Sequence, residues 1–394
     1  MTARARVAHL STAHPPRDGR VFRKECVSLA QAGADVWFIG AQDGDEVDHG
    51  VNVVGIGAAT SRLDRLTRRQ WRAWKALDEV NPDVVHVHDP ELIPLVLAWR
   101  TLRRRAAVYD AHEDLVGQIE GKAYLPDAIK PLASLVARGV VGLADRCFDG
   151  IVASTETVLS FYRNPNRQVV RNYPLLSDFP AVAEVEKEPG QVAYIGSISG
   201  ARQVDRMFDM VRQTPGAHLV IAGKPTPDVA HHFEEISADD PITWLGHIPG
   251  ETIPDILAKS VVGVAFFRPI RNYQKALPTK LFEYMAAGIP FISTDLPFLV
   301  ELFSGHDCGV FVDTSQDAEA ASAALAELMA DPQRCRRMGA NGRKAIEERF
   351  NFEAEVDRLV AVEQAALRRR DASITASPTP RRAVEDTERA DTAR

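Results

Sequence analysis

Cysteine is scarce in this sequence, and long apolar runs do not occur in it. The four cysteines, at positions 26, 147, 308 and 335, are scattered without paired spacing, which argues against a disulfide framework and against a zinc site. This usage indicates a protein of a reducing cytoplasm. No segment approaches ~18 uninterrupted apolar residues, so none is expected to span a membrane. The apolar run near the N-terminus is too short for a signal peptide.

Basic side chains are also in the minority. The net charge of −7 excludes a nucleic-acid-binding surface over the whole molecule, although local basic faces remain compatible with it. With 45% hydrophobic and 26% charged residues the composition is that of an ordinary globular protein. A chain of 394 residues is too long for one core, so we expect two domains of roughly 150 to 200 residues each.

Short β-branched runs alternate with helical stretches along both halves of the chain. Such alternation predicts an α/β fold in which βαβ units form parallel sheets. An irregular, acidic, proline-bearing stretch at 173–190 separates a Rossmann-like domain at 1–172 from a second one at 191–350. Residues 371–394 contain hardly any apolar side chains and are expected to be disordered.

Histidines and carboxylates follow three predicted strands of the first half. Ligands of such sheets bind beyond the carboxyl ends of the strands, so we expect these side chains to converge on one rim. A single histidine in a loop is more often a structural or solvated residue, but a cluster of them suits hydroxyl recognition and proton transfer near neutral pH. The residues are His14, Asp18 and Arg20 in the first loop, His88 and Asp89 in the second, and His112 and Glu113 in the third.

A short helix at 278–288 is the most informative element of the second half. Pro278 and Thr279 begin it, and Gly288 with Pro290 ends it. The free amides of its first turn and the Lys280 ammonium together favour an anion such as a diphosphate. The alternative is an ordinary amphipathic helix whose polar side chains are merely solvated.

The run from Pro278 to Pro290, with the glutamate before Tyr-Met-Ala-Ala-Gly, resembles the donor-binding helix of GT-B glycosyltransferases, in particular the large retaining, bacterial family 4-like group. The resemblance implies two Rossmann-like domains facing across a cleft, with the second one binding a nucleotide sugar. It implies that Glu283 binds the donor ribose and that amides of this helix hold the diphosphate. It also implies that a last helix, at 351–370, crosses back to the first domain.

Two positions depart from the family pattern. Lys275 stands where the family commonly has its first glutamate, and Ser197 replaces the first basic residue of a phosphate-gripping loop. Arg202 can stand for the second. The loops after the second-half strands complete the expected donor site, which comprises Gly196, Ser197, Arg202, Gly223, Lys224, His247, Lys275, Thr279, Lys280, Leu281 and Glu283.

The loops of the first half resemble the acceptor side of the same group, so the rim residues above are expected to bind the acceptor. His112 matches a histidine that family members use close to the reacting sugar. Fixed positive charge aimed at the departing diphosphate is the expected catalytic device, so Arg202 and Lys280 are the other two catalytic candidates. No Asp-rich metal site is evident, and no metal and no cofactor are expected besides the nucleotide sugar.

The sequence thus predicts a hexosyltransferase that moves a sugar, with retention, to an unidentified acceptor in polysaccharide, glycoconjugate or secondary-metabolite biosynthesis. A glycan, a lipid-linked molecule and a small molecule are the alternatives for that acceptor. Two rival functions remain open: a non-catalytic nucleotide-sugar-binding partner subunit and a GT-B sugar-nucleotide epimerase. Base, sugar and oligomeric state are not predicted.

One further segment bears on location. Residues 62–75 are expected to form one helix with Leu63 and Leu66 packed inward, basic side chains outward, and Trp71 and Trp74 beside them. A basic helix that carries tryptophan can lie on an anionic membrane surface. The alternative is a solvated helix whose tryptophans pack on the domain. The expected location is the cytoplasm, with weak peripheral contact to the inner membrane face as the second interpretation.

Overall fold

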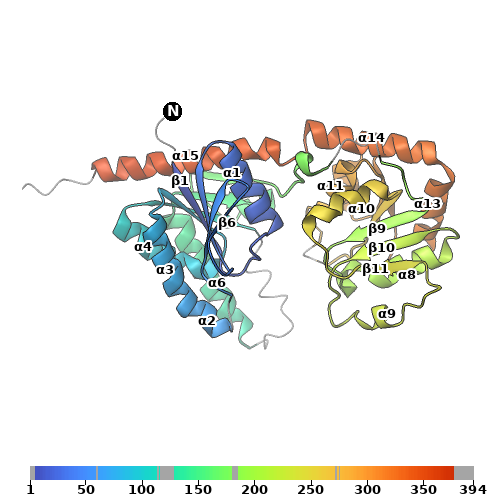
Figure 1. Ribbon diagram of the computed structural model, residues 1–394, viewed down its shortest axis with the longest axis horizontal. Coiled ribbons are helices and arrows are strands. Elements are labelled where there is room, and N and C mark those ends of the chain that lie inside the picture. The colour runs from blue at the N-terminus through green and yellow to red at the C-terminus, as the bar shows by residue number, and fades with distance from the viewer. Residues whose placement is uncertain are drawn as a thin grey trace, which may run out of the picture.

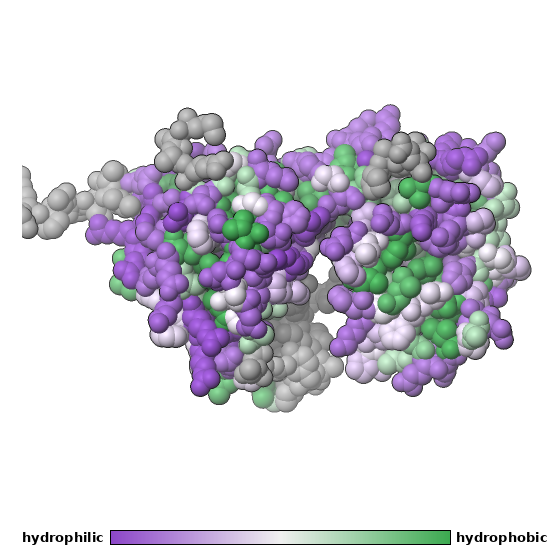
Figure 2. All heavy atoms as spheres, in the orientation of Figure 1, coloured by the Kyte–Doolittle hydropathy of each residue, from purple (hydrophilic) through white to green (hydrophobic). Residues whose placement is uncertain are grey.

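The computed structural model shows two parallel α/β sheets, one in each half of the chain (Figure 1). The structure describes residues 5–58, 61–112, 115, 128–179, 185–270, 273–274 and 276–376. Two of the predicted site residues, Lys275 and Glu113, lie outside these ranges. In the space-filling view a hollow separates the two halves (Figure 2).

The first sheet has eight strands in the order β3-β4-β2-β1-β5-β6-β7-β8. All neighbours are parallel except β3 and β4. The central strands are buried on both faces, which explains their nearly continuous apolar sequence. The strands are β1 (Arg6–Leu10), β2 (Asp35–Gly40), β3 (Glu46–Asp48), β4 (Val51–Gly55), β5 (Val84–Val87), β6 (Ala106–Ala111), β7 (Gly150–Ala153) and β8 (Arg167–Val169).

Helices cover both faces of this sheet. Apolar residues of α3, α4 and α6 pack on one face, while the other is covered by a π-helical segment (Gly19–Cys26), α1 and α15. The helices of the first half are α1 (Val27–Gln31), α2 (Arg62–Leu66), α3 (Arg68–Val80), α4 (Ile93–Arg103), α6 (Lys130–Cys147) and α7 (Glu156–Leu159).

The second sheet has six parallel strands in the order β11-β10-β9-β12-β13-β14. Its strands are β9 (Gln191–Ile195), β10 (His218–Ala222), β11 (Ile242–Trp244), β12 (Val262–Ala265), β13 (Phe291–Thr294) and β14 (Gly309–Val312). Residues of α8 and α13 pack on one face, and α10, α11 and α12 on the other. The helices are α8 (Val204–Gln213), α9 (His231–Glu234), α10 (Ile253–Lys259), α11 (Thr279–Ala286), α12 (Pro297–Phe303), α13 (Glu319–Ala330) and α14 (Pro332–Glu348).

The last helix, α15 (Glu353–Ala376), belongs to the core of the first half although it follows the second in the chain. Figure 1 shows it in line with α14 along one side of the molecule. Its Leu359 and Val362 are fully buried against the first sheet, and the Val362 carbonyl accepts a hydrogen bond from Asn166. The helix continues to Ala376, past the predicted end at residue 370, so part of the predicted disordered tail is helical.

The helix predicted at 62–75 differs from the structure. It is two helices, α2 and α3, which meet at Thr67, where the backbone leaves the helical region. Because of this break the apolar side chains of α2 do not point inward: Leu63 is 71% exposed and Leu66 56% exposed. Arg69 is buried instead, and its guanidinium donates to the carbonyls of Thr12 and Gly57.

Candidate active site

The three histidines predicted at the rim of the first sheet lie together in the structure. They follow β1, β5 and β6, which are neighbours in the sheet. His88 Nδ1 lies 3.2 Å from His112 Nε2 with the rings stacked, and the ring centroids of His14 and His112 are 5.1 Å apart. The predicted convergence of these strand ends is therefore present.

Asp89 connects the first loop to the three histidines through hydrogen bonds. Its Oδ1 lies 3.2 Å from His14 Nδ1, while Oδ2 accepts hydrogen bonds from the amides of Thr12 and Ala13. Burial alone would raise the pKa of Asp89, but these hydrogen bonds and the charge of His14 lower it below its usual range. Burial opposes the charge on His14 as well, yet the bond to Asp89 raises the pKa of His14. The pair can therefore hold a proton at the rim near neutral pH.

The pKa of His112 is shifted in the opposite direction to that of His14. Burial lowers the pKa of its imidazole to about 4, an effect that the nearby Asp110 carboxylate only partly offsets. The ring is therefore neutral at physiological pH, with 16% of its side chain still exposed. The backbone carbonyl of His112 accepts from Ser154 Oγ at 2.6 Å, which fixes the loop. Its Nε2 lies against His88 and its buried Nδ1 faces Asp110 at 3.5 Å, so the neutral ring borders the rim without adding charge to it.

Asp18 and Arg20, the other two first-loop candidates, do not join the rim cluster of histidines. The Asp18 carboxylate caps the π-helical segment by accepting from the amides of Arg20 and Val21, both at 2.8 Å. The Arg20 side chain is buried and forms ion pairs with Asp110 and Glu25, each at 3.1 Å. Both side chains thus have structural contacts in this loop, and no local sequence pattern predicts the pairing with Glu25.

On the second half, Lys280 lies in the first turn of α11 and is only 9% exposed. Its Nζ packs over the ring of Tyr194 and against Gly196, where a Cβ would lie 2.3 Å from the nitrogen. Gly196 has a φ of +131°, so glycine is required there both for the backbone and for the room it leaves. Burial and the charge of Arg202 lower the pKa of Lys280 to about 8, against the attraction of Glu283.

Arg202 is the second cation of this group. It ends a 3-10 turn, and its guanidinium stacks over the rings of Phe267 and Tyr273, at 4.8 and 4.5 Å from the centroids. Within the described ranges neither Arg202 nor Lys280 forms an ion pair with a carboxylate. Two neighbouring cations, one of them buried, make this place suited to an anion.

The remaining predicted donor residues surround these cations in different ways. The amide of Gly223 (φ +141°) donates to the Gly246 carbonyl, and a Cβ on Gly223 would lie 1.9 Å from the Gly196 carbonyl oxygen. The ends of β9, β10 and β11 therefore lie side by side at this point. Ser197, Lys224 and His247 are exposed next to them. Leu281 is a core residue whose amide donates to the Pro278 carbonyl, which leaves the amides of Thr279 and Lys280 for a ligand.

Glu283, one turn further along α11, is half-buried. Its charge partly offsets the effect of burial on Lys24, whose pKa is lowered to about 8. Lys24 comes from the π-helical segment of the first half and donates to Asn172 Oδ1 at 2.7 Å. The donor helix thus lies within electrostatic reach of the first half. Sequence patterns do not single out Lys24, because one lysine in a helical stretch is usually solvated.

Comparison with known proteins agrees with this arrangement. Residues 19–172 match the family model for a glycosyl transferase 4-like domain, and residues 178–345 match the model for glycosyl transferases group 1. A protein of Bacillus subtilis named as a teichuronic acid biosynthesis glycosyltransferase, TuaH, is 24% identical over 106 residues. That match covers 27% of this chain and 27% of the relative, so the chain spans about a quarter of its length.

Solved structures show the same fold over nearly the whole chain. Sucrose-phosphate synthase from Thermosynechococcus elongatus has a TM-score of 0.71 at 18% identity, covering 94% of this chain and 100% of that one. HepE of Anabaena, in complex with UDP-glucose, gives 0.67 at 14% identity over 92% and 100% of the two chains. WaaG, a glycosyltransferase involved in lipopolysaccharide biosynthesis, gives 0.62 at 15% identity, over 91% and 98%. With the two family models matched over residues 19–172 and 178–345 and this shared fold, the chain belongs to the GT-B glycosyltransferases.

Proposed function

We propose that this glycosyltransferase moves a hexosyl group from a nucleoside diphosphate sugar to an acceptor bound at the His14, His88 and His112 rim. The observation that carries the proposal is the pair of cations, Lys280 and Arg202, beside the first turn of α11 and without a carboxylate partner among the described residues. The complex of HepE with UDP-glucose supports a donor of this class.

Departure of the nucleoside diphosphate is the difficult step, because negative charge grows on the leaving oxygen while the sugar becomes oxocarbenium-like. Lys280, Arg202 and the free amides of Thr279 and Lys280 would meet that charge. Their fixed positions would cost no reorganisation during the reaction. In this scheme the two side chains take the place of a divalent ion on the diphosphate, so added Mg²⁺ or Mn²⁺ should leave the rate unchanged.

Glu283 would accept hydrogen bonds from the ribose hydroxyls, and neutral His112 would orient the reacting sugar or the acceptor hydroxyl. We propose that the anomeric configuration is retained, as the resemblance of the α11 sequence to retaining enzymes implies. NMR of the product's anomeric proton would test this point directly, and inversion would contradict it.

The test of the donor class is a thermal-shift screen of the full chain against nucleoside diphosphates and their sugars. A ligand of the folded state raises the melting temperature by mass action, by about 2.7 kcal/mol of apparent stability at one hundred times Kd. The best donor is then incubated with the enzyme without acceptor. Slow release of free sugar supports a transferase, interconversion of two nucleotide sugars supports an epimerase, and tight binding without turnover supports a binding subunit.

A membrane-presented acceptor is supported by a separate observation. Leu63, Leu66 and Trp71 are all more than half exposed in a segment rich in arginine, whose Arg69 donates to the Thr12 carbonyl in the first rim loop. In the described part of the chain no helix is long and apolar enough to cross a bilayer. Flotation with anionic vesicles would show salt-sensitive binding that a Leu63→Ser, Leu66→Ser double variant loses, and equal flotation of both proteins would count against it.

A further inference from the structure

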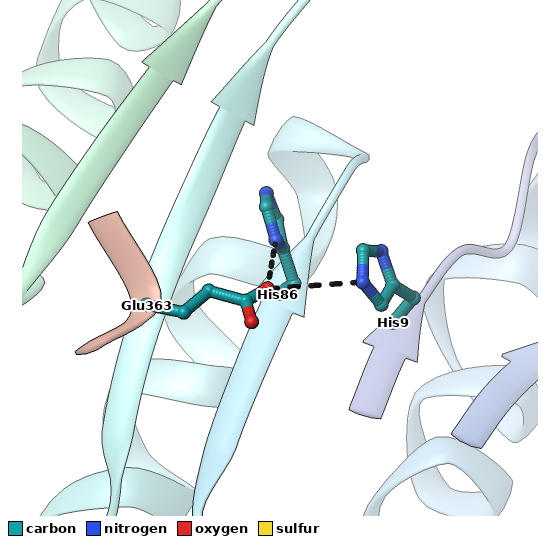
Figure 3. Close-up of side chains that lie close together, drawn as sticks. All are labelled: His9, His86 and Glu363. Carbon is teal, nitrogen blue, oxygen red and sulfur yellow. Dashed lines mark hydrogen bonds and ion pairs between the residues drawn. The ribbon is translucent and has the colours of Figure 1, made fainter. Parts of the chain in front are cut away.

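Three potential metal ligands meet in the interior of the first half, beneath the rim cluster. They are His9 of β1, His86 of β5 and Glu363 of α15 (Figure 3). His9 and His86 are fully buried and Glu363 is 5% exposed. Glu363 Oε1 lies 3.3 Å from His86 Nδ1 and 3.9 Å from His9 Nε2. None of the three has a part in the proposed transfer reaction.

One ring nitrogen of His9 is left over at this point. His9 Nδ1 lies 2.9 Å from His88 Nε2, and the Nδ1 of His88 faces both His112 Nε2 at 3.2 Å and the Asp110 carboxylate at 3.5 Å. In the His88 tautomer with its proton on Nδ1, the His88 Nε2 accepts from His9 Nδ1, and His9 Nε2 carries no hydrogen. Among the described residues it has no hydrogen-bond partner, although it is buried and faces the carboxyl oxygen of Glu363.

The distances suit an ion better than a direct hydrogen bond between His9 and Glu363. A separation of 3.9 Å is too long for such a bond. Zinc binds imidazole nitrogen and carboxylate oxygen at about 2.0 to 2.2 Å, so two ligands of one tetrahedral ion lie about 3.3 to 3.5 Å apart. The two separations from Glu363 Oε1, 3.3 and 3.9 Å, are near this value, and the three ligand atoms all lie within 4.8 Å of one another.

The charge balance of the surrounding buried groups also leaves room for a bound cation. Three carboxyl groups, on Glu25, Asp110 and Glu363, are buried together, and Arg20 forms ion pairs with the first two of them. Both oxygens of Glu25 lack a well-formed hydrogen bond from a described residue. Three ionised carboxylates and one guanidinium have a net charge of −2. Either two added protons or one divalent cation would balance this charge.

We propose that His9, His86 and Glu363 supply three of the four ligands of one divalent transition-metal ion of the zinc class, with water as the fourth, in a structural role. Imidazole and carboxylate ligands suit Zn²⁺ and exclude a preference for Ca²⁺. Because two ligands come from the sheet and one from α15, the ion would fasten that helix to β1 and β5. It would also fix the His9 tautomer that donates to His88, and through His88 the ring of His112.

The test uses the full chain, stripped of metal with a chelator and then dialysed. Zinc content after reloading is measured by inductively coupled plasma mass spectrometry, and Co²⁺ is added in parallel as a visible-absorbing probe. We expect one equivalent of zinc per chain, an intense d–d absorption band from buried tetrahedral Co²⁺, and a higher melting temperature with zinc. Absence of stoichiometric zinc and of the cobalt band from the wild-type protein would overturn the proposal without any variant.

Two variants locate the ion. Glu363→Gln keeps the shape of the side chain but removes the charged ligand, so zinc affinity should fall at least 100-fold. Asp357→Asn is the matched control, because Asp357 is an exposed carboxylate on the same helix, and its zinc affinity should be unchanged. If the two variants bind zinc equally, the ion lies elsewhere, for example at the adjacent His231 and His232, and the buried carboxyls hold protons instead.

Discussion

Replacement of Lys280 by methionine should stabilise the protein while disabling it. The wild-type pKa of Lys280 falls from 10.5 to about 8, mainly through burial, which corresponds to about 3 kcal/mol of penalty on the charged form. Methionine fills a similar volume without charge. It loses the contact of the ammonium with the Tyr194 ring, worth about 1 to 2 kcal/mol. The net expectation at pH 7 is a gain of about 1 to 2 kcal/mol in the free energy of unfolding.

The pH dependence of that gain follows from the direction of the shift. Between pH 8 and 10.5 the unfolded chain binds more protons at this lysine than the folded chain does, so wild-type stability rises with pH in this window. Below about pH 8 the wild-type protein bears the full free-energy penalty of burying a charged Lys280. The advantage of Lys280→Met should therefore be constant from pH 6 to 7.5 and disappear by about pH 10.5.

Turnover should move in the opposite direction, falling by about 10²- to 10³-fold, because the charge met by Lys280 grows in the transition state. Denaturant unfolding at several pH values and donor hydrolysis are the two assays. Lys344→Met, whose parent side chain is 73% exposed on α14, is the control and should change neither. A destabilised Lys280→Met protein, or one with normal turnover, would refute the reasoning.

Three further outcomes are expected. Glu283→Gln should weaken nucleotide binding by about 1 to 3 kcal/mol through loss of a charged ribose acceptor, and unchanged affinity by calorimetry would place Glu283 outside the site. His112→Ala should cut transfer severely and leave nucleotide affinity nearly intact, because the nucleotide belongs to the other half; normal hydrolysis by a fully folded variant would remove His112 from catalysis. Asp110→Asn should cost about 3 to 5 kcal/mol of stability, since it removes one of the two carboxylates that pair with the buried Arg20 guanidinium; a loss below about 1 kcal/mol would show that Glu25 alone suffices.

Local sequence patterns were sufficient to predict most of the fold. The alternation of short apolar runs with helices predicts both parallel sheets, and proline and glycine place α11 within a residue or two of its observed limits. The convergence of His14, His88 and His112 was predictable because each follows a strand of one parallel sheet. These features depend on neighbouring residues or on a general rule of sheet geometry.

Features that depend on distant partners were not predictable in the same way. Leu63 and Leu66 match a helical apolar stripe, yet the break at Thr67 leaves them exposed. The burial of Lys280 follows from its packing against Tyr194 and Gly196, which no local pattern indicates. No local pattern predicts the cluster of His9, His86 and Glu363, because Glu363 lies 277 positions from His86 in the sequence.

The position of α15 has a consequence for synthesis of the protein. Phe352, Leu359, Val362 and Ala366 complete one of the two apolar cores of the first domain, yet the ribosome produces them only after about 180 further residues beyond position 172. At about 5 to 20 residues per second, the sheet face that they cover stays open for roughly 10 to 40 seconds. During that time the nascent first domain presents apolar surface of the kind that chaperones bind. A chain truncated before Glu353 would lack the helix that covers this surface.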